Sequence, residues 1–168
     1  DFRWQSDFAS FLVAIHEAGK GATDLVLNGD TFELWQSAAD DCRYREERLG
    51  CTEKEALGRL ERVVAAHSAD LAALGMFARN GSNRLILVAG DHDAALLFPA
   101  VAARAVAAFN APGRVEVATP RYWLSADGAV YAEHGHQRPG DPYAFTTWPQ
   151  PFVRGGAGLH EERPPGER

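Results

Sequence analysis

The stretch DLVLNGD at residues 24–30 predicts how this chain folds, because it is a short apolar run that ends in a glycine and an aspartate. The stretch RLILVAGD at residues 84–91 repeats the same pattern. Continuous apolar runs of this length, bounded by turn residues, are typical of buried strands. Two strands with a long connection between them suit a parallel βαβ unit, so we expect parallel neighbours that each end in a carboxylate.

Helices are expected before, between and after these two strands. Thr52 and Glu55 form a capping box, which predicts the start of one long helix that continues as far as Asn80. Pro99 begins the next helix, since proline suits the first helical turn. The helix before the first strand is indicated by apolar residues at helical spacing, namely Phe8, Phe11, Leu12 and Ile15.

The pattern changes in the last third of the chain. Short strands are predicted at residues 114–118, 121–124 and 129–133. Beyond Pro149, glycines and paired prolines favour a loop or a disordered tail over residues 151–168. The fold class expected from the whole pattern is α/β, with a mostly parallel sheet and an antiparallel part toward the C-terminus.

Composition sets further limits on size and partners. With 168 residues, of which 46% are hydrophobic, the chain suits one globular domain. Its formal charge of −6 argues against nucleic-acid binding by phosphate neutralisation, and no apolar run approaches the roughly 20 residues that cross a bilayer. The charged segment at residues 36–51 is expected to be a lid insertion or a surface loop. The chain begins at Asp1 without a methionine, so we expect a fragment or a processed chain.

Cys42 and Cys51 bear on the compartment. Their separation fits neither a C-x-x-C redox pair nor a usual zinc site, which leaves two unrelated thiols or a disulfide. The cytoplasm is the favoured location, whereas a disulfide would indicate the periplasm or secretion. The sequence leaves both alternatives open.

Residues capable of chemistry gather at the predicted strand ends. Ligands of open α/β sheets collect at the carboxyl ends of strands, where Asp30 and Asp91 lie. Two carboxylates brought together repel each other unless a cation lies between them. His92 and His134 add imidazoles, and this mixture of ligands suits Mn, Fe, Co or Zn. The alternative for each aspartate taken alone is a helix N-cap.

Three strings, LVLNGDTFELW at residues 25–35, LVAGDHD at 87–93 and YAEHGHQ at 131–137, resemble the second, third and fourth motifs of the calcineurin-like metallophosphoesterases. The first string is particularly similar to the branch that contains the UDP-2,3-diacylglucosamine pyrophosphohydrolases. The resemblance implies a metallophosphoesterase-type α/β sandwich, with mixed sheets flanked by helices, over residues 1–150. It also implies hydrolysis of a phosphoester or pyrophosphate bond in a phosphorylated small-molecule or lipid-linked substrate.

The same resemblance implies two divalent metal ions in a binuclear centre, with manganese as the first expectation. Asp30 would bridge the two ions, and Asp91 and His134 would ligate one of them. Two such cations clamp the phosphate oxygens and lower the pKa of a bound water toward roughly 7. The resulting hydroxide would attack phosphorus.

The resemblance implies two further site residues, and a polar loop supplies two more candidates. His92 would be the catalytic residue that approaches the leaving group, and Asp93 would orient it. His136 and Arg138 lie in a polar loop beside the expected metals, where an arginine can bind a phosphate through two hydrogen bonds. The alternative for this loop is an ordinary turn rich in proline and glycine.

Two departures from the family pattern limit the expected activity. Asp91 stands where the family has Asn, which should strengthen the attraction for metal and weaken the hold on an anionic substrate. The family's first motif, D-x-H, and its last, G-H-x-H, are not found, so we expect a catalytic domain truncated at both ends and weakly active or inactive. The rival function is a non-catalytic interaction scaffold with the same fold. A phosphatase with a covalent aspartyl intermediate is disfavoured, because its D-x-D-x-T motif would need an aspartate at Asn28.

Overall fold

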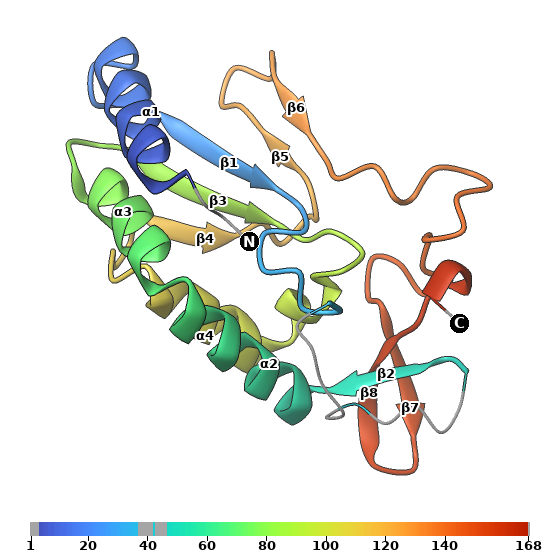
Figure 1. The fold of residues 1–168 in the computed structure, drawn as a ribbon. Coiled ribbons are helices and arrows are strands. Elements are labelled where there is room, and N and C mark those ends of the chain that lie inside the picture. The colour runs from blue at the N-terminus through green and yellow to red at the C-terminus, as the bar shows by residue number, and fades with distance from the viewer. Residues whose placement is uncertain (1–3, 37–41, 43–46, 168) are drawn as a thin grey trace.

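A three-stranded parallel sheet forms the centre of this computed structural model, which describes residues 4–36, 42 and 47–167 (Figure 1). Its strands are β1 (Asp24–Asn28), β3 (Arg84–Val88) and β4 (Val115–Val117), in the order β1-β3-β4. In the register of β1 and β3, Asp24 lies opposite Arg84 and Asn28 lies opposite Val88. The two apolar stretches are therefore parallel neighbours, as predicted, and they end at the same edge of the sheet.

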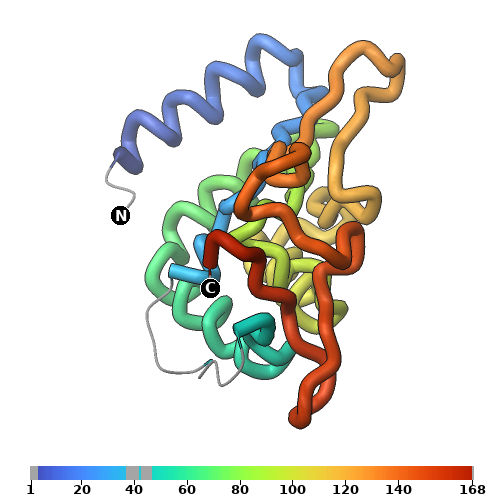
Figure 2. Tube along the Cα trace, turned by 90° about the vertical axis from the view of Figure 1, so that its right-hand side faces the viewer, coloured from blue at the N-terminus to red at the C-terminus, as the bar shows by residue number. Residues whose placement is uncertain are grey.

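Helices cover one face of this sheet, and a hairpin lies on the other (Figure 2). The side chains of β3 alternate between the two faces, so Leu85 and Leu87 join the helix-covered core while Ile86 and Val88 pack with Trp123 of the hairpin. This arrangement confirms the mixed α/β class. The helices are α1 (Gln5–Ala18), α2 (Glu53–Ala66), α3 (Ser68–Arg79) and α4 (Pro99–Ala108), and the hairpin consists of β5 (Trp123–Leu124) and β6 (Tyr131–Ala132).

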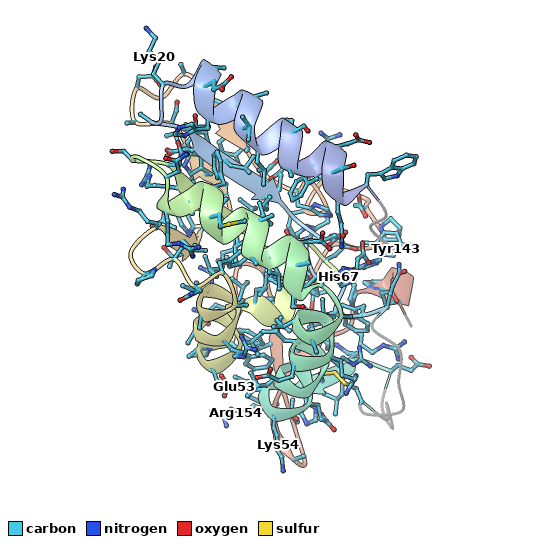
Figure 3. All side chains as sticks on the ribbon, turned by 60° about the vertical axis from the view of Figure 1, so that its left-hand side comes forward. Lys20, Glu53, Lys54, His67, Tyr143 and Arg154 are labelled. Carbon is cyan, nitrogen blue, oxygen red and sulfur yellow. A yellow bond between two sulfur atoms is a disulfide. The ribbon has the colours of Figure 1, made fainter. Side chains whose placement is uncertain are left out.

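The long helix predicted over residues 52–80 is wrong in one respect, because it is two helices that meet at His67 (Figure 3). The predicted capping box is present, with the backbone N–H of Thr52 donating to the Glu55 carboxylate over 2.8 Å. At His67 the backbone leaves helical geometry, and the imidazole lies 3.4 Å from Asp70 in the first turn of α3. The break lets α2 pack on α4 while α3 packs on α1 and β3. Apolar residues continue at helical spacing across His67, so the sequence pattern did not reveal the break.

The prediction of a loop or disordered tail at residues 151–168 is also wrong for the part that the structure describes. A hairpin of β7 (Phe152–Gly155) and β8 (Gly158–Glu162) pairs with β2 (Leu49–Thr52) in a second, antiparallel sheet. The rings of Phe152 and Phe98 lie 4.3 Å apart between centroids, which fastens the hairpin to the main core. The charged end of β8 misled the prediction, because Glu161 and Glu162 are buried. Short 3-10 helices follow β3 (η1, Ala94–Leu97) and β8 (η2, Pro165–Glu167).

Cys42 and Cys51 form a disulfide, with their Cα atoms 5.1 Å apart. This bond is typical of oxidising compartments and gives weak support to the periplasmic or secreted alternative. The lid predicted at residues 36–51 falls largely outside the described residues, and its last part belongs to β2. Within the described part of the chain, the helices are too short or too polar to cross a bilayer.

Candidate metal centre

Two glycines allow the ends of β1 and β3 to approach each other closely. Gly29, with φ +88°, lies directly against the imidazole of His134, so a Cβ at this position would overlap the ring. Gly90 lies in the same way against the carboxylate of Asp30. Only glycine leaves room for a side chain so close to the backbone. The glycines of the two strand ends therefore bring functional side chains together as well as turning the chain.

The imidazole of His134 lies between the two carboxylates that the sequence singled out. Its Nε2 is 3.1 Å from Asp30 Oδ2 and 3.0 Å from Asp91 Oδ1. Its Nδ1 lies 2.9 Å from the carbonyl oxygen of Asn28, which fixes a proton on Nδ1. The Nε2 lone pair would repel both carboxylates, so a proton or a metal ion must lie on this side of the ring. The structure thus brings Asp30, Asp91 and His134 together.

The electrostatics of this group reflect burial and close charges. Burial raises the pKa of Asp30, and the negative charge of Asp91 adds to the rise, against the opposing effect of His134. Burial lowers the pKa of His134, but the Asn28 carbonyl and the two carboxylates outweigh it, so the pKa is raised overall. Carboxylates that crowd one imidazole in this way form a site that attracts cations.

His92 is held by a carboxylate that the sequence analysis did not assign to the site. Its Nδ1 lies 2.8 Å from Glu33 Oε2, while its Nε2 lies 3.7 Å from Asp91 Oδ2 and 3.5 Å from Glu167 Oε1. Burial lowers the pKa of His92, but the hydrogen bond to Glu33 and the neighbouring carboxylates raise it overall. The signal for Glu33 was its place in the same motif as Asp30, three residues further on.

Asp93 does not take the orienting role that was expected of it. Its carboxylate is fully buried and accepts hydrogen bonds from the backbone N–H groups of Phe32, at 2.8 Å, and Leu34, at 3.1 Å. Burial raises the pKa of Asp93 to about 7. Asp93 therefore shapes the loop that carries Glu33, and Glu33 is the residue that contacts His92.

His136 is buried deeper than a substrate-binding residue in an open loop would be. It is 6% exposed, and its ring lies edge-on against Phe145 and Trp148, with centroids 5.5 and 4.8 Å away. Both ring nitrogens are buried without a hydrogen-bond partner among the described residues. Burial lowers the pKa of His136 to about 4, which keeps the ring neutral. Arg138, in contrast, is exposed.

The candidate ligands fall into two adjacent groups. Asp91, His134 and His136 form one, and Asp30, Glu33 and His92 form the other, with the ligand atoms of each group within 4.8 Å of one another. The contact between His134 and Asp30 joins the groups. Nitrogen and oxygen donors in this proportion fit Mn, Fe, Co or Zn.

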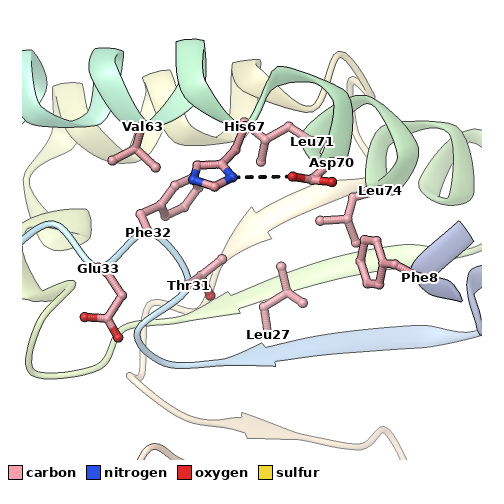
Figure 4. Close-up of a pocket in the computed structure, with 10 residues that line it drawn as sticks. All are labelled: Phe8, Leu27, Thr31, Phe32, Glu33, Val63, His67, Asp70, Leu71 and Leu74. Atoms are coloured by element: carbon pink, nitrogen blue, oxygen red, sulfur yellow. Dashed lines mark hydrogen bonds and ion pairs between the residues drawn. The ribbon is translucent and has the colours of Figure 1, made fainter. Parts of the chain in front are cut away.

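Two cavities adjoin the centre. A cavity of about 320 Å³ is lined by the first group and by Arg138, Asp141 and Tyr143. A larger cavity of about 510 Å³ lies between β1 and the helices, with Glu33 on its wall next to Thr31 (Figure 4). Its other lining residues are mainly apolar, and the His67–Asp70 pair lines the side formed by the helices. This second cavity could not be predicted from the sequence, because it forms only when distant segments assemble.

Three aromatic side chains near the centre, Trp35, Phe145 and Trp148, make structural contacts. Phe145 and Trp148 stack on each other and enclose His136. Trp35 donates a hydrogen bond from its indole N–H to Glu161 over 3.0 Å, which ties the Glu33 loop to β8. These side chains hold the residues of the centre in place.

The chain matches no protein-family model, no curated protein and no solved structure. The likeness of its three motifs to the metallophosphoesterases is therefore an interpretation of the sequence. The function is therefore inferred from the arrangement of side chains at the strand ends.

Proposed function

We propose that this protein is a metal-dependent phosphoesterase of the calcineurin-like type, which hydrolyses a phosphoester or pyrophosphate bond in a phosphorylated small-molecule or lipid-linked substrate. The observation that carries the proposal is the position of His134 Nε2, 3.1 and 3.0 Å from carboxylates on two different strands. A parallel sheet with helices on one face and a β-hairpin on the other supports a metallophosphoesterase-type sandwich.

Asp30, Asp91 and His134 would hold the metal. Asp30 also belongs to an adjacent group of candidate ligands, which supports the expectation of two divalent ions, manganese first. When bound, such ions activate a water molecule and neutralise charge on the phosphate. The negative charge of Asp91, in place of the neutral Asn of the family, favours metal over anionic substrate.

His92 would donate a proton to the leaving oxygen. Burial lowers the pKa of His92, but the hydrogen bond to Glu33 and the nearby carboxylates raise it overall, and the contact with Glu33 fixes the direction of the ring. A positioned general acid contributes about 10²–10⁴-fold to a rate. Glu33 is a positioning residue in this scheme, since it acts through His92.

Arg138 and the two cavities would hold the rest of the substrate. Arg138 lines the smaller cavity beside Asp91 and His134, where its guanidinium can bind phosphate oxygens. The larger, mainly apolar cavity reaches Glu33 and suits the apolar part of a lipid-linked leaving group. A polar cavity for the phosphate and an apolar cavity for the leaving group would suit the expected substrate class.

The test is hydrolysis of bis-p-nitrophenyl phosphate with and without Mn²⁺. We expect slow turnover that Mn²⁺ stimulates and a chelator abolishes, and the Asp30→Asn variant should lose about 100-fold or more because a metal ligand is gone. Asp24→Asn is the matched control, since Asp24 lies at the other end of β1 and pairs with Arg84. Turnover that is unaffected by Mn²⁺ and by Asp30→Asn would refute the proposal.

A non-catalytic interaction scaffold is the second candidate. The observation that favours it is a group of exposed apolar side chains on and beside the β5–β6 hairpin, namely Tyr122, Leu124, Val130 and Tyr131. Exposed apolar patches mark surfaces that bind partners. Complete absence of metal-dependent turnover in the assay above would favour this function.

A further inference from the structure

His136 differs from the other two histidines of the centre, because its ring nitrogens have no polar contact within the described part of the chain that would explain their burial. Both of its nitrogens are buried and have no hydrogen-bond partner among the described residues. A buried polar atom without a partner costs free energy, and such atoms in folded proteins call for an explanation such as an ion or a water. The loop that carries His136 therefore holds an imidazole ready for a ligand.

The surroundings of His136 fix its ring without using its nitrogens. The ring stands at 89° to Phe145 and 88° to Trp148, and these two aromatic rings stack at 14° to each other. The ring of His134 lies 5.5 Å from the ring of His136 between centroids. Edge-on aromatic packing orients His136, and neither ring nitrogen has a hydrogen-bond partner among the described residues.

The position of His136 completes a set of three donors. One nitrogen of His136, one nitrogen of His134 and one carboxylate oxygen of Asp91 lie within 4.8 Å of one another. Two imidazoles and one carboxylate form a common zinc ligand set that leaves a position open for water or substrate. A set with two nitrogens also disfavours Mg²⁺, which prefers oxygen ligands.

We propose that His136 is a metal ligand, and that Asp91, His134 and His136 together form a site for one Zn²⁺-like or Co²⁺-like cation. This revises the substrate-binding role expected of His136. It rests on the proposed function for the metal at Asp91 and His134, but it does not require hydrolysis. Asp30, whose carboxylate oxygen Oδ2 lies 3.1 Å from His134 Nε2, borders this site from the adjacent group of candidate ligands.

The test measures metal binding directly, by calorimetric titration with Zn²⁺ and by the visible absorption of bound Co²⁺. His136→Phe keeps an aromatic ring against Phe145 and Trp148 and removes both nitrogens. This variant should fold, which thermal unfolding checks. We expect this variant to lose about 100-fold in Zn²⁺ affinity and to change the Co²⁺ spectrum, since an imidazole ligand is lost. His16→Phe is the matched control and should bind as the wild type does, because His16 contacts Asn83 away from the centre.

The outcomes separate this inference from the proposed function. Equal Zn²⁺ affinity and equal Co²⁺ spectra in the wild type and in His136→Phe would overturn the inference, even if the protein hydrolyses phosphoesters. Loss of binding in His136→Phe would support the inference even if the protein has no hydrolytic activity. A wild type that binds neither ion would overturn it as well.

Discussion

At the scale of single residues, three imidazoles in one centre have three different environments. His134 faces two carboxylates, His92 is held by Glu33, and His136 packs edge-on against two aromatic rings. The identities of Asp30, Asp91 and His134 were predictable, because each follows an apolar strand. The partner of His92 was not predictable from neighbouring positions, because Asp93 turns into the core and Glu33 approaches from another loop.

A prediction at this scale concerns Glu33. In Glu33→Gln the side chain keeps its length but loses the charge that favours the protonated imidazole of His92. We expect turnover of bis-p-nitrophenyl phosphate to fall about 10- to 100-fold, within the range of a general acid's contribution. Zn²⁺ affinity at Asp91 and His134 should stay the same in a calorimetric titration.

Glu116→Gln is the control for this substitution, because Glu116 is exposed on β4. It should leave turnover unchanged. If Glu33→Gln kept full turnover, the role of Glu33 as a positioning residue would be disproved.

At the scale of elements, local signals predicted the helices and the parallel strands better than their ends. The capping box at Thr52 and the proline at Pro99 begin helices where expected, since both act within one turn. The break at His67 and the β7–β8 hairpin depend on tertiary packing. Phe152 in the core and the buried Glu162, hydrogen-bonded to Thr147, stabilise strands whose composition favours a loop.

Substitution of two helical glycines by alanine should change the free energy of unfolding in opposite directions. A Cβ at Gly75 of α3 would overlap the carbonyl oxygen of Phe109 at the end of α4, whereas a Cβ at Gly58 of α2 meets nothing within 4 Å. We expect Gly75→Ala to destabilise the fold by about 1–3 kcal/mol through overpacking. Gly58→Ala should stabilise it by up to about 1 kcal/mol, because alanine is the better helix former.

Chemical denaturation followed by circular dichroism measures both free energies of unfolding. Equal effects of the two substitutions would contradict the close packing of α3 on the end of α4. The comparison uses the same chemical change in two helices, so it isolates the contact with Phe109.

At the scale of the whole molecule, the second sheet and the loop of the centre are joined through buried polar groups. Glu161 of β8 is 3% exposed and accepts the indole N–H of Trp35, while buried Arg59 donates to the carbonyl oxygen of Leu34. The first contact joins the C-terminal hairpin to the loop that contains Glu33, and the second joins α2 to the same loop. Sequence patterns show no such link, because Trp35 and Glu161 are far apart along the chain.

The pH dependence of stability tests this link. Burial raises the pKa of Glu161 from 4.5 to about 8, so the folded protein keeps a proton that the unfolded chain releases. The stability from this group is complete below pH 4.5 and is lost as the pH rises through about 8. Glu161→Gln mimics the protonated acid, so the wild type should lose stability relative to this variant as the pH rises across that window.

Urea unfolding at several pH values gives these free energies, and Glu116→Gln should follow the wild type. A constant difference between the wild type and Glu161→Gln across the window would show that Glu161 titrates normally. The pH dependence would then have to arise elsewhere in the molecule.

The most direct test of the metal centre is anomalous X-ray diffraction from crystals of the protein soaked in Zn²⁺. The arrangement of Asp30, Asp91 and His134 predicts an anomalous peak at the carboxyl ends of β1 and β3, about 2.0–2.2 Å from His134 Nε2 and an Asp91 oxygen. A difference map with these side chains in place and no anomalous peak among them would contradict the account.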